Sequence, residues 1–243
     1  MIVLLSQPTK LKTGFQFFED FLSLVFPRTC CLCKASLFEF EDQLCKSCIT
    51  KLPVTNYHLR PQNNDLVTKV TGLTKPGLVM SFLRFSKMGE SQELLHLLKY
   101  KNRPELGMEL GRIYGNLLKI NGFIGIWSQI TPVPLHPLKQ RRRGYNQSEQ
   151  FALGLSEAIQ VPVVLSLRRV QFTETQTKKS RMQRLENVAE VFAIQESLPV
   201  RDKTVLLVDD VMTTGATLTT CANVLFQHAA KTVDMAVIAA GKN

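Results

Sequence analysis

The chain has 243 residues, a formal net charge of +10 and a hydrophobic content of 44%. This length is sufficient for one α/β core with a small additional module. The composition is that of a globular protein, without repeats or low-complexity segments, and it excludes a fibrous or disordered chain.

Apolar residues recur at helical spacing in residues 14–26, which predicts an amphipathic helix packed on the body of the protein. A helix that lies on a membrane surface or binds a partner is the alternative. The segment is too short to span a bilayer, contains two acidic residues and is followed by no small-residue cleavage site. We therefore expect no transmembrane segment, no signal peptide and a cytoplasmic protein. The apolar positions are Phe15, Phe18, Leu22, Val25 and Phe26.

Five of the six cysteines lie close together, and four of them form two CxxC pairs separated by eleven residues. Each pair can present two thiolates from one tight turn, and two such turns complete a tetrahedral zinc site with Zn–S distances of about 2.3 Å. Four thiolates leave no open position, so the expected zinc is structural; a remnant without metal is the alternative. Cys31 could instead pair with Cys33, and Cys221 is expected to be a buried apolar residue. The predicted ligands are Cys30, Cys33, Cys45 and Cys48.

The domain boundary is placed near residue 60, with a cysteine-containing module in residues 1–60 and an α/β domain in residues 61–243. Residues 53–87 show little pattern and are interpreted as a linker and the entry to the second domain. Residues 93–101 predict an amphipathic helix packed through its leucines, with a cationic carboxyl-terminal turn.

Residues 130–147 predict a short strand followed by a stiff loop rich in proline and arginine, with helix resuming near Ser148. Arg142, Arg143 and Asn146 in this loop are candidate diphosphate contacts. The loop begins a basic stretch: residues 139–184 contain ten basic and three acidic residues, and so contribute +7 of the net +10. Such a stretch suits a pyrophosphate-bearing substrate or a nucleic acid, although a solvated basic face has the same composition.

Residues 168–187 are polar and weakly periodic, which is typical of a mobile basic arm that closes over a ligand. Its candidate contacts are Gln176, Lys178, Arg181 and Arg184.

The most informative segment is residues 205–220, in which an apolar strand ends in Asp209 and Asp210 and a turn of small and hydroxyl residues precedes a helix. Backbone N–H groups at such a helix start favour an anion, and the turn hydroxyls add donors for a phosphate. Paired carboxylates suit vicinal hydroxyls and a hydrated Mg²⁺, so a ribose 5-phosphate group fits the pattern. An ordinary strand–turn–helix connection is the alternative. The turn consists of Thr213, Thr214, Gly215, Ala216 and Thr217.

Apolar strands alternate with helices along the second half of the chain, which predicts a doubly wound, mostly parallel α/β sheet. The expected core strands are residues 130–133, 161–165, 205–208 and 232–239. Residues 213–217 are called the phosphate turn below, and residues 218–228 are expected to form the helix that follows it.

Residues 205–217 resemble the phosphoribosyl pyrophosphate (PRPP) signature of type I phosphoribosyltransferases, position by position. The resemblance implies that Asp209 and Asp210 hold the ribose hydroxyls and that residues 213–217 hold the 5-phosphate. It further implies that these two acids act in catalysis with Mg²⁺, Arg142 and Arg143, which would stabilise the departing diphosphate. Enzymes for 6-oxopurines carry an aspartate where this chain has Thr213, so that substrate class is not expected.

Four segments and the CxxC pairs occur in the order seen in the ComF family of competence proteins, one branch of which is named for gluconate uptake. The segments are KYKNRP, PVPLHPLKQRRRGYNQ, TQTKKSRMQRLENV and VLLVDDVMTTGAT. The resemblance implies a PRPP-binding domain, a zinc module and a role in handling single-stranded DNA during natural competence, with a helicase and a recombination mediator as partners. A catalytic phosphoribosyltransferase, a non-catalytic PRPP- or nucleotide-sensing module and a nucleobase-salvage enzyme remain as alternatives.

Overall fold

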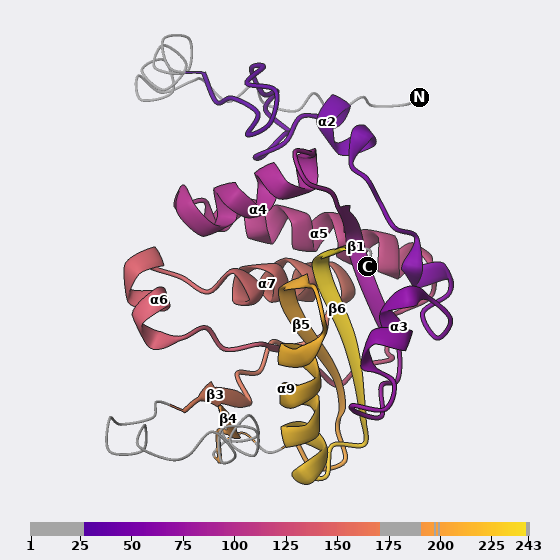
Figure 1. Ribbon diagram of the computed structural model, residues 1–243. Helices are drawn as coiled ribbons and strands as arrows, with labels where there is room; N and C mark the ends of the chain where they lie inside the picture. The colour runs from indigo at the N-terminus through magenta and orange to yellow at the C-terminus, as the bar shows by residue number, and fades with distance from the viewer. Residues whose placement is uncertain (1–26, 171–190, 197, 199, 242–243) are drawn as a thin grey trace, which may run out of the picture.

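The computed structural model describes residues 27–170, 191–196, 198 and 200–241 (Figure 1). The expected amino-terminal helix in residues 14–26 lies outside the described residues, as do Gln176, Lys178, Arg181 and Arg184. No helix in the described ranges combines the length and the apolar character needed to cross a bilayer.

Four parallel strands form the central sheet, in the order β1-β6-β5-β2. Because every pairing is parallel, the carboxyl ends of all four strands meet at one edge of the sheet. A separate antiparallel ribbon contains two further strands, β3 (Leu167–Arg169) and β4 (Phe192–Ile194). The central strands are β1 (Val79–Phe85), β2 (Gln129–Pro132), β5 (Thr204–Met212) and β6 (Thr232–Gly241).

Helices cover both faces of the sheet, as expected for a doubly wound fold (Figure 1). Three of them lie on one face: α4 (Glu90–Tyr100), α5 (Pro104–Ile120) and α7 (Gln147–Ile159). The other face carries α3 (Asp65–Val70) and α9 (Ala216–Gln227). The remaining short helices are α2 (Lys46–Lys51), η1 (Tyr57–Leu59) and α6 (Pro137–Arg143).

Strand β5 shows why the central strands read as continuous apolar runs. Leu206 and Val208 belong to the core beneath α4, α5 and α7, whereas Val205 and Leu207 belong to the core beneath α9. Since successive side chains point to opposite faces and both faces are covered, all positions from Val205 to Val208 are apolar. The strands expected in residues 130–133, 205–208 and 232–239 are therefore confirmed.

The strand expected in residues 161–165 is wrong. This segment runs beside β2 but forms only an isolated bridge, between Val163 and Ile130. Ile130 donates its N–H to Pro162 O, and its carbonyl accepts from Val164 N. Both hydrogen bonds between the two segments thus involve the same residue of β2. Pro162 has no N–H of its own and cannot extend the ladder.

The interpretation of residues 53–87 as a linker is also wrong, because β1 lies inside it and pairs in parallel with β6. Residues 53–55 run along the outer edge of β1: Thr55 N donates to Phe82 O and Arg84 N donates to Pro53 O. The cysteine-containing segment is thus continuous with the sheet through this pairing.

Helices α5 and α7 approach each other closely because glycines line their contact. A Cβ atom at Gly154 would lie 2.0 Å from Met108 O, and one at Gly111 would lie 2.3 Å from Phe151 O. Backbone atoms occupy the space of both missing side chains, so the two helices could not keep this separation if either position carried a side chain.

Replacing Gly154 with alanine is therefore expected to lower the free energy of unfolding by about 3 kcal/mol, because α7 must move away from α5. Denaturant unfolding followed by circular dichroism measures this difference. Asn116→Ala, at an exposed position of α5, is the control and should change the value by less than about 0.5 kcal/mol. Equal stabilities of the two variants would contradict the close packing.

Candidate functional site

The two acidic residues predicted from the sequence lie at the carboxyl end of β5. Asp209 Oδ1 accepts hydrogen bonds from Ser148 Oγ and from the N–H of Asp210, both at 2.8 Å. Asp210 Oδ2 pairs with Lys99 Nζ at 2.9 Å, and its side chain is 14% exposed. Helices α4 and α7 therefore each contribute a side chain to the acidic pair.

Leu98, at the end of α4, explains how Lys99 and Ser148 come together. Its carbonyl oxygen accepts from Tyr145 Oη and, at 3.4 Å, from Gln147 Nε2. These bonds hold the end of α4 against the start of α7, next to the end of β5.

Burial, together with the charge of the adjacent Asp210, raises the pKa of Asp209 to about 7 from its ordinary value of 3.8. The hydrogen bonds from Ser148 and from the Asp210 N–H oppose this shift. An uncharged Asp209 is thus favoured below neutral pH, and a nearby cation such as a metal ion would restore the carboxylate.

The raised pKa of Asp209 predicts how stability varies with pH. The folded protein binds a proton at Asp209 that the unfolded chain has already lost, so the free energy of unfolding falls as the pH rises from about 4 to about 7. Asp209→Asn removes this loss, and we expect the variant to exceed the wild type by about 1–3 kcal/mol at pH ~8 and to match it at pH ~4. Urea unfolding at both pH values measures the difference. A variant that is equally stable or less stable at the higher pH would contradict the shift.

The turn after β5 forms the start of α9, as predicted. Gly215 has a φ of +83°, in the left-handed region that favours glycine, and it precedes the first helical residue. Thr213, Thr214 and Thr217 are exposed. A pocket of about 30 Å³ is lined by residues 211–218 together with Asp209. Gly215 has no side chain with which to cap α9, and the Ala216 N–H makes only a long hydrogen bond to Thr214 Oγ1, at 3.4 Å. The first N–H groups of α9 can therefore turn to an anion.

Lys69, on α3, stabilises the turn in residues 213–217 through hydrogen bonds to backbone carbonyl groups. Its Nζ donates to Thr213 O at 3.1 Å and to Gly241 O, at the end of β6, at 2.6 Å. A Cβ atom on Gly215 would lie 3.0 Å from Val70 Cγ1, so α3 also packs directly against the turn.

The proline- and arginine-rich loop predicted after β2 is instead the short helix α6, capped by the His136 side chain and ended by Gly144. The prediction of a loop is wrong because Pro137 occupies the first turn of the helix, where no N–H is needed. Arg142 is exposed. Arg143 is half-buried: it donates to Gln147 Oε1 at 2.6 Å and lies over the Tyr100 ring.

Asn146 connects the start of α7 to the segment after β2 through its side-chain hydrogen bonds. Its side chain caps α7 through Ser148 N and donates to Val133 O at 3.0 Å. It thereby joins the end of β2 to the helix that carries Ser148.

Sequence reasoning missed three residues at this edge of the sheet, namely Lys69, Lys99 and Ser148. The predicted cationic end of the helix in residues 93–101 includes Lys99, and the predicted helix start after the arginine-rich loop lies near Ser148. Lys69 lies in the segment interpreted as a linker, and no local signal indicated it.

The four predicted ligand cysteines form one cluster in the structure. The sulfur atoms of Cys30, Cys33, Cys45 and Cys48 all lie within 4.8 Å of one another. Four thiolates at such separations match the donor set and the tetrahedral size that Zn²⁺ prefers, so the cluster could hold a metal such as zinc. Cys31 is buried apart from this set, with its Sγ 3.6 Å from Gln43 Oε1, and Cys221 is buried in the core, as expected.

The cysteine cluster is docked on α5. Glu109 Oε2 accepts from Gln43 N at 2.8 Å, and Arg112 pairs with Asp42 at 2.6 Å. Burial raises the pKa of Glu109 to about 7. Cys30 and Leu44 are fully buried within the same core that contains α4 and α5. The cysteine segment thus shares a hydrophobic core with the sheet domain.

Residues 142–243 match the family model described as "Phosphoribosyl transferase domain". The matched range contains the acidic pair, the turn and strands β5 and β6, and the parallel sheet with helices on both faces is the corresponding fold. The carboxyl-terminal part of this chain is a phosphoribosyltransferase domain.

The chain is ComF-like, because its relatives include competence and DNA-utilization proteins. It is 39% identical over 100 residues to Competence protein F of Haemophilus influenzae, covering 40% of this chain and 43% of that protein. It is 31% identical over 148 residues to DNA utilization protein YhgH of Escherichia coli O157:H7, covering 58% of this chain and 63% of that protein. The chain therefore spans less than two thirds of either relative.

A solved structure with partial similarity is the allosteric regulatory enzyme of purine biosynthesis. It is 21% identical, with a TM-score of 0.43, and the match covers 58% of this chain and 29% of that one.

Proposed function

We propose that this protein binds PRPP with Mg²⁺ at the carboxyl end of β5 and transfers its phosphoribosyl group. The observation that carries the proposal is the position of Asp209 and Asp210 near the end of β5, with only residues 211–215 between them and the start of α9. Sugar-binding carboxylates and an anion-binding helix start are then separated by only one turn of chain.

In this proposal the 5-phosphate contacts the N–H groups of residues 213–217, where the helix dipole stabilises negative charge. The ribose hydroxyls donate to the acidic pair. Lys99 Nζ pairs with Asp210 Oδ2, so a sugar hydroxyl that binds Asp210 would leave this ammonium group close to the diphosphate. Ser148 and the Asp210 N–H fix the orientation of the Asp209 carboxylate.

Transfer breaks the bond between C1 of the ribose and the diphosphate oxygen, and pyrophosphate leaves with the electron pair. A nitrogen nucleophile forms the new bond at C1 and loses its proton to solvent. The protein contributes positioning and charge neutralisation. Arg142 and Arg143, on α6 and beside the start of α7, are the arginines proposed to stabilise the departing diphosphate, and Mg²⁺ would neutralise part of its charge.

We further propose that this activity serves DNA utilization in natural competence, as the names of the relatives suggest. The exposed cations of α6 support contact with single-stranded DNA. Cysteine thiols kept as metal ligands suit a reducing compartment, which supports a cytoplasmic protein.

The test of catalysis is release of pyrophosphate from PRPP and Mg²⁺, screened against nucleobases, amines and single-stranded oligonucleotides. We expect release that depends on one class of acceptor and is lost in Asp210→Asn. PRPP binding without release under any acceptor would reject transfer and leave a sensing module.

The DNA role is tested separately, by fluorescence anisotropy with single-stranded DNA at several salt concentrations. Affinity should fall steeply with salt, and Lys139→Gln with Arg142→Gln should reduce both the affinity and its dependence on salt. A salt-independent affinity, or one unchanged in the double variant, would reject α6 as the DNA contact.

A further inference from the structure

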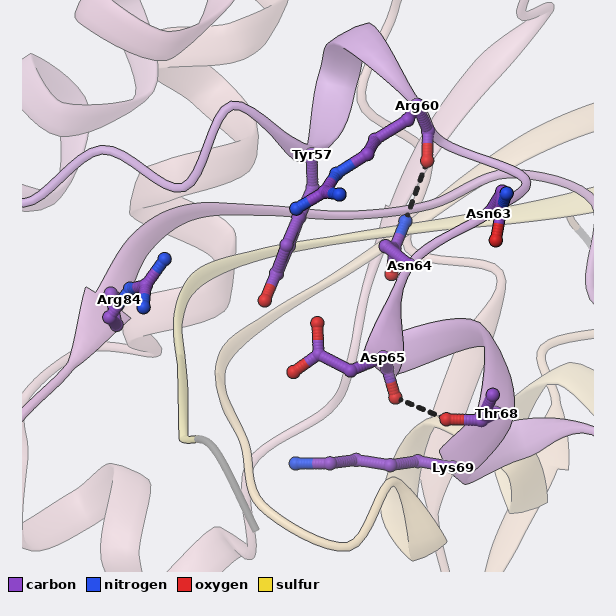
Figure 2. Close-up of a pocket in the computed structure, with 8 residues that line it drawn as sticks. All are labelled: Tyr57, Arg60, Asn63, Asn64, Asp65, Thr68, Lys69 and Arg84. Carbon is purple, nitrogen blue, oxygen red and sulfur yellow. Dashed lines mark hydrogen bonds between the residues drawn. The ribbon is translucent and has the colours of Figure 1, made fainter.

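A polar cavity lined by described residues near the phosphate turn has no place in the site described so far. It measures about 620 Å³ and is built mainly from residues 57–69, with Arg84 of β1 on its far side (Figure 2). We name it the arginine pocket, after Arg60 and Arg84. Its volume lies within the range of about 300–1,000 Å³ that is typical of small-molecule sites.

The buried Asn64 makes the arginine pocket rigid. Its Oδ1 caps α3 by accepting from Leu66 N and Val67 N, and its Nδ2 donates to Arg60 O at 3.0 Å and to Val79 O at 2.9 Å. One side chain thus ties the preceding loop, the start of α3 and strand β1 together. The pocket is a preformed feature of the fold, because each of its walls is fixed through Asn64.

The net positive charge of the arginine pocket favours an anionic ligand. The lining contains three cations, Arg60, Lys69 and Arg84, and a single carboxylate, Asp65, which leaves a charge of +2. A guanidinium binds phosphate through a planar pair of N–H donors, and a phosphate monoester carries about −1.5 to −2 near neutral pH. The pocket charge therefore balances one phosphate monoester.

The cations of the arginine pocket are available to such a ligand. Across the described ranges, the ion pairs involve Lys99 and Arg112 rather than Arg60 or Arg84, and both of these arginines are exposed. Lys69 uses two of its three ammonium donors on Thr213 O and Gly241 O. Figure 2 shows the Asp65 carboxylate between the Tyr57 hydroxyl and the Lys69 amine. There the carboxylate and the hydroxyl can accept hydrogen bonds from a hydroxyl or amino group of the ligand.

Helix α3 separates the arginine pocket from the phosphate turn. Lys69 lines the pocket and also holds the carbonyl of Thr213. Arg84 stands opposite Ala240 near the ends of β1 and β6, at the sheet edge where β5 presents its acidic pair. A ligand in the pocket would therefore lie beside a ligand on the turn, with one lysine between them.

We propose that the arginine pocket is a second anion site that binds the phosphate of a nucleotide, either free or at the 5′ end of a DNA strand. Arg60 and Arg84 hold the phosphate, and the Asp65 carboxylate accepts a hydrogen bond from a hydroxyl of the sugar or an amino group of the base. The position of this nucleotide beside PRPP rests on the proposed function, but its binding to the pocket does not.

The test is a calorimetric titration of AMP into the full chain carrying Thr214→Asp, in which the added carboxylate repels an anion from residues 213–217. We expect AMP to bind one site, and Arg60→Gln with Arg84→Gln to weaken it by about 100-fold, or about tenfold for each guanidinium. Adenosine, which lacks the phosphate, should bind far more weakly. Arg201→Gln, an exposed arginine before β5, is the matched control and should leave the affinity unchanged.

A second variant keeps both arginines. Asn63 is exposed at the pocket, and Asn63→Asp adds a carboxylate that should repel the phosphate and weaken AMP by about tenfold. Comparing oligothymidylate with and without a 5′-phosphate distinguishes a DNA end from a free nucleotide: competition by only the phosphorylated strand identifies the DNA end as a ligand. Competition by neither strand assigns the pocket to free nucleotides.

The proposal is overturned if Thr214→Asp abolishes AMP binding, since AMP would then be using residues 213–217. It is also overturned if its affinity is the same in the Arg60/Arg84 variant. Should PRPP with Mg²⁺ fail to bind the wild-type chain while AMP still depends on both arginines, the proposed function fails and the arginine pocket stands.

Discussion

Replacing both Asp209 and Asp210 with asparagine is expected to lower the affinity for PRPP with Mg²⁺ by about 100-fold or more. Each carboxylate would lose a charge-assisted hydrogen bond to a ribose hydroxyl, and the hydrated metal would lose its anionic partners. Asparagine keeps an oxygen that can accept from Ser148 and from the backbone, so the turn should keep its shape. Titration calorimetry measures the affinity directly.

The control for this pair is Asp202→Asn, in the turn before β5 at the opposite edge of the sheet. Asp202 has a φ of 59°, which asparagine tolerates well, so the change removes a carboxylate without strain. We expect its PRPP affinity to equal that of the wild type. An unchanged affinity in the folded Asp209/Asp210 variant would rule out the end of β5 as the sugar site.

Removal of the metal is expected to have the second large effect, because the cysteine cluster is part of the main core. The purified protein should contain about one zinc per chain, and Cys48→Ser should lose it together with at least about 3 kcal/mol of unfolding free energy. Without the metal, Cys30 and Leu44 would no longer be held against α4 and α5. Elemental analysis and thermal unfolding test both parts of this prediction.

Cys31→Ser is the matched control for the metal, since Cys31 is buried but lies apart from the four clustered sulfurs. A serine hydroxyl can also donate to Gln43, the present partner of the thiol. We expect this variant to keep its zinc. A chain that contains no metal and is nevertheless as stable as the wild type would contradict the structural role.

The acidic pair and the phosphate turn could be predicted from sequence because the whole arrangement is local. The residues from Val205 to Thr217 form consecutive parts of a strand, a turn and a helix start, and each part has its own composition. The two CxxC pairs could be predicted for the same reason, since a tight turn brings each pair of sulfurs together without help from the rest of the fold.

Strand β1 could not be predicted in this way. It contains Ser81 and Arg84, which interrupt its apolar run, so its composition gives no clear strand signal. Residues 161–165 show the converse: their composition favours a strand, but Pro162 limits the pairing to a single bridge. Lys69, Lys99 and Ser148 reach the phosphate turn and the acidic pair only through the packing of three helices around the sheet.

Residues 53–55 cover part of the outer edge of the sheet. Strand β1 is an edge strand, and its outward N–H and C=O groups at Phe82 and Arg84 are occupied by this short segment. A protein shortened from its amino end beyond this point would present bare peptide groups along β1, which is the geometry that recruits a strand from another molecule. The segment that joins the cysteine cluster to the domain therefore also guards against aggregation.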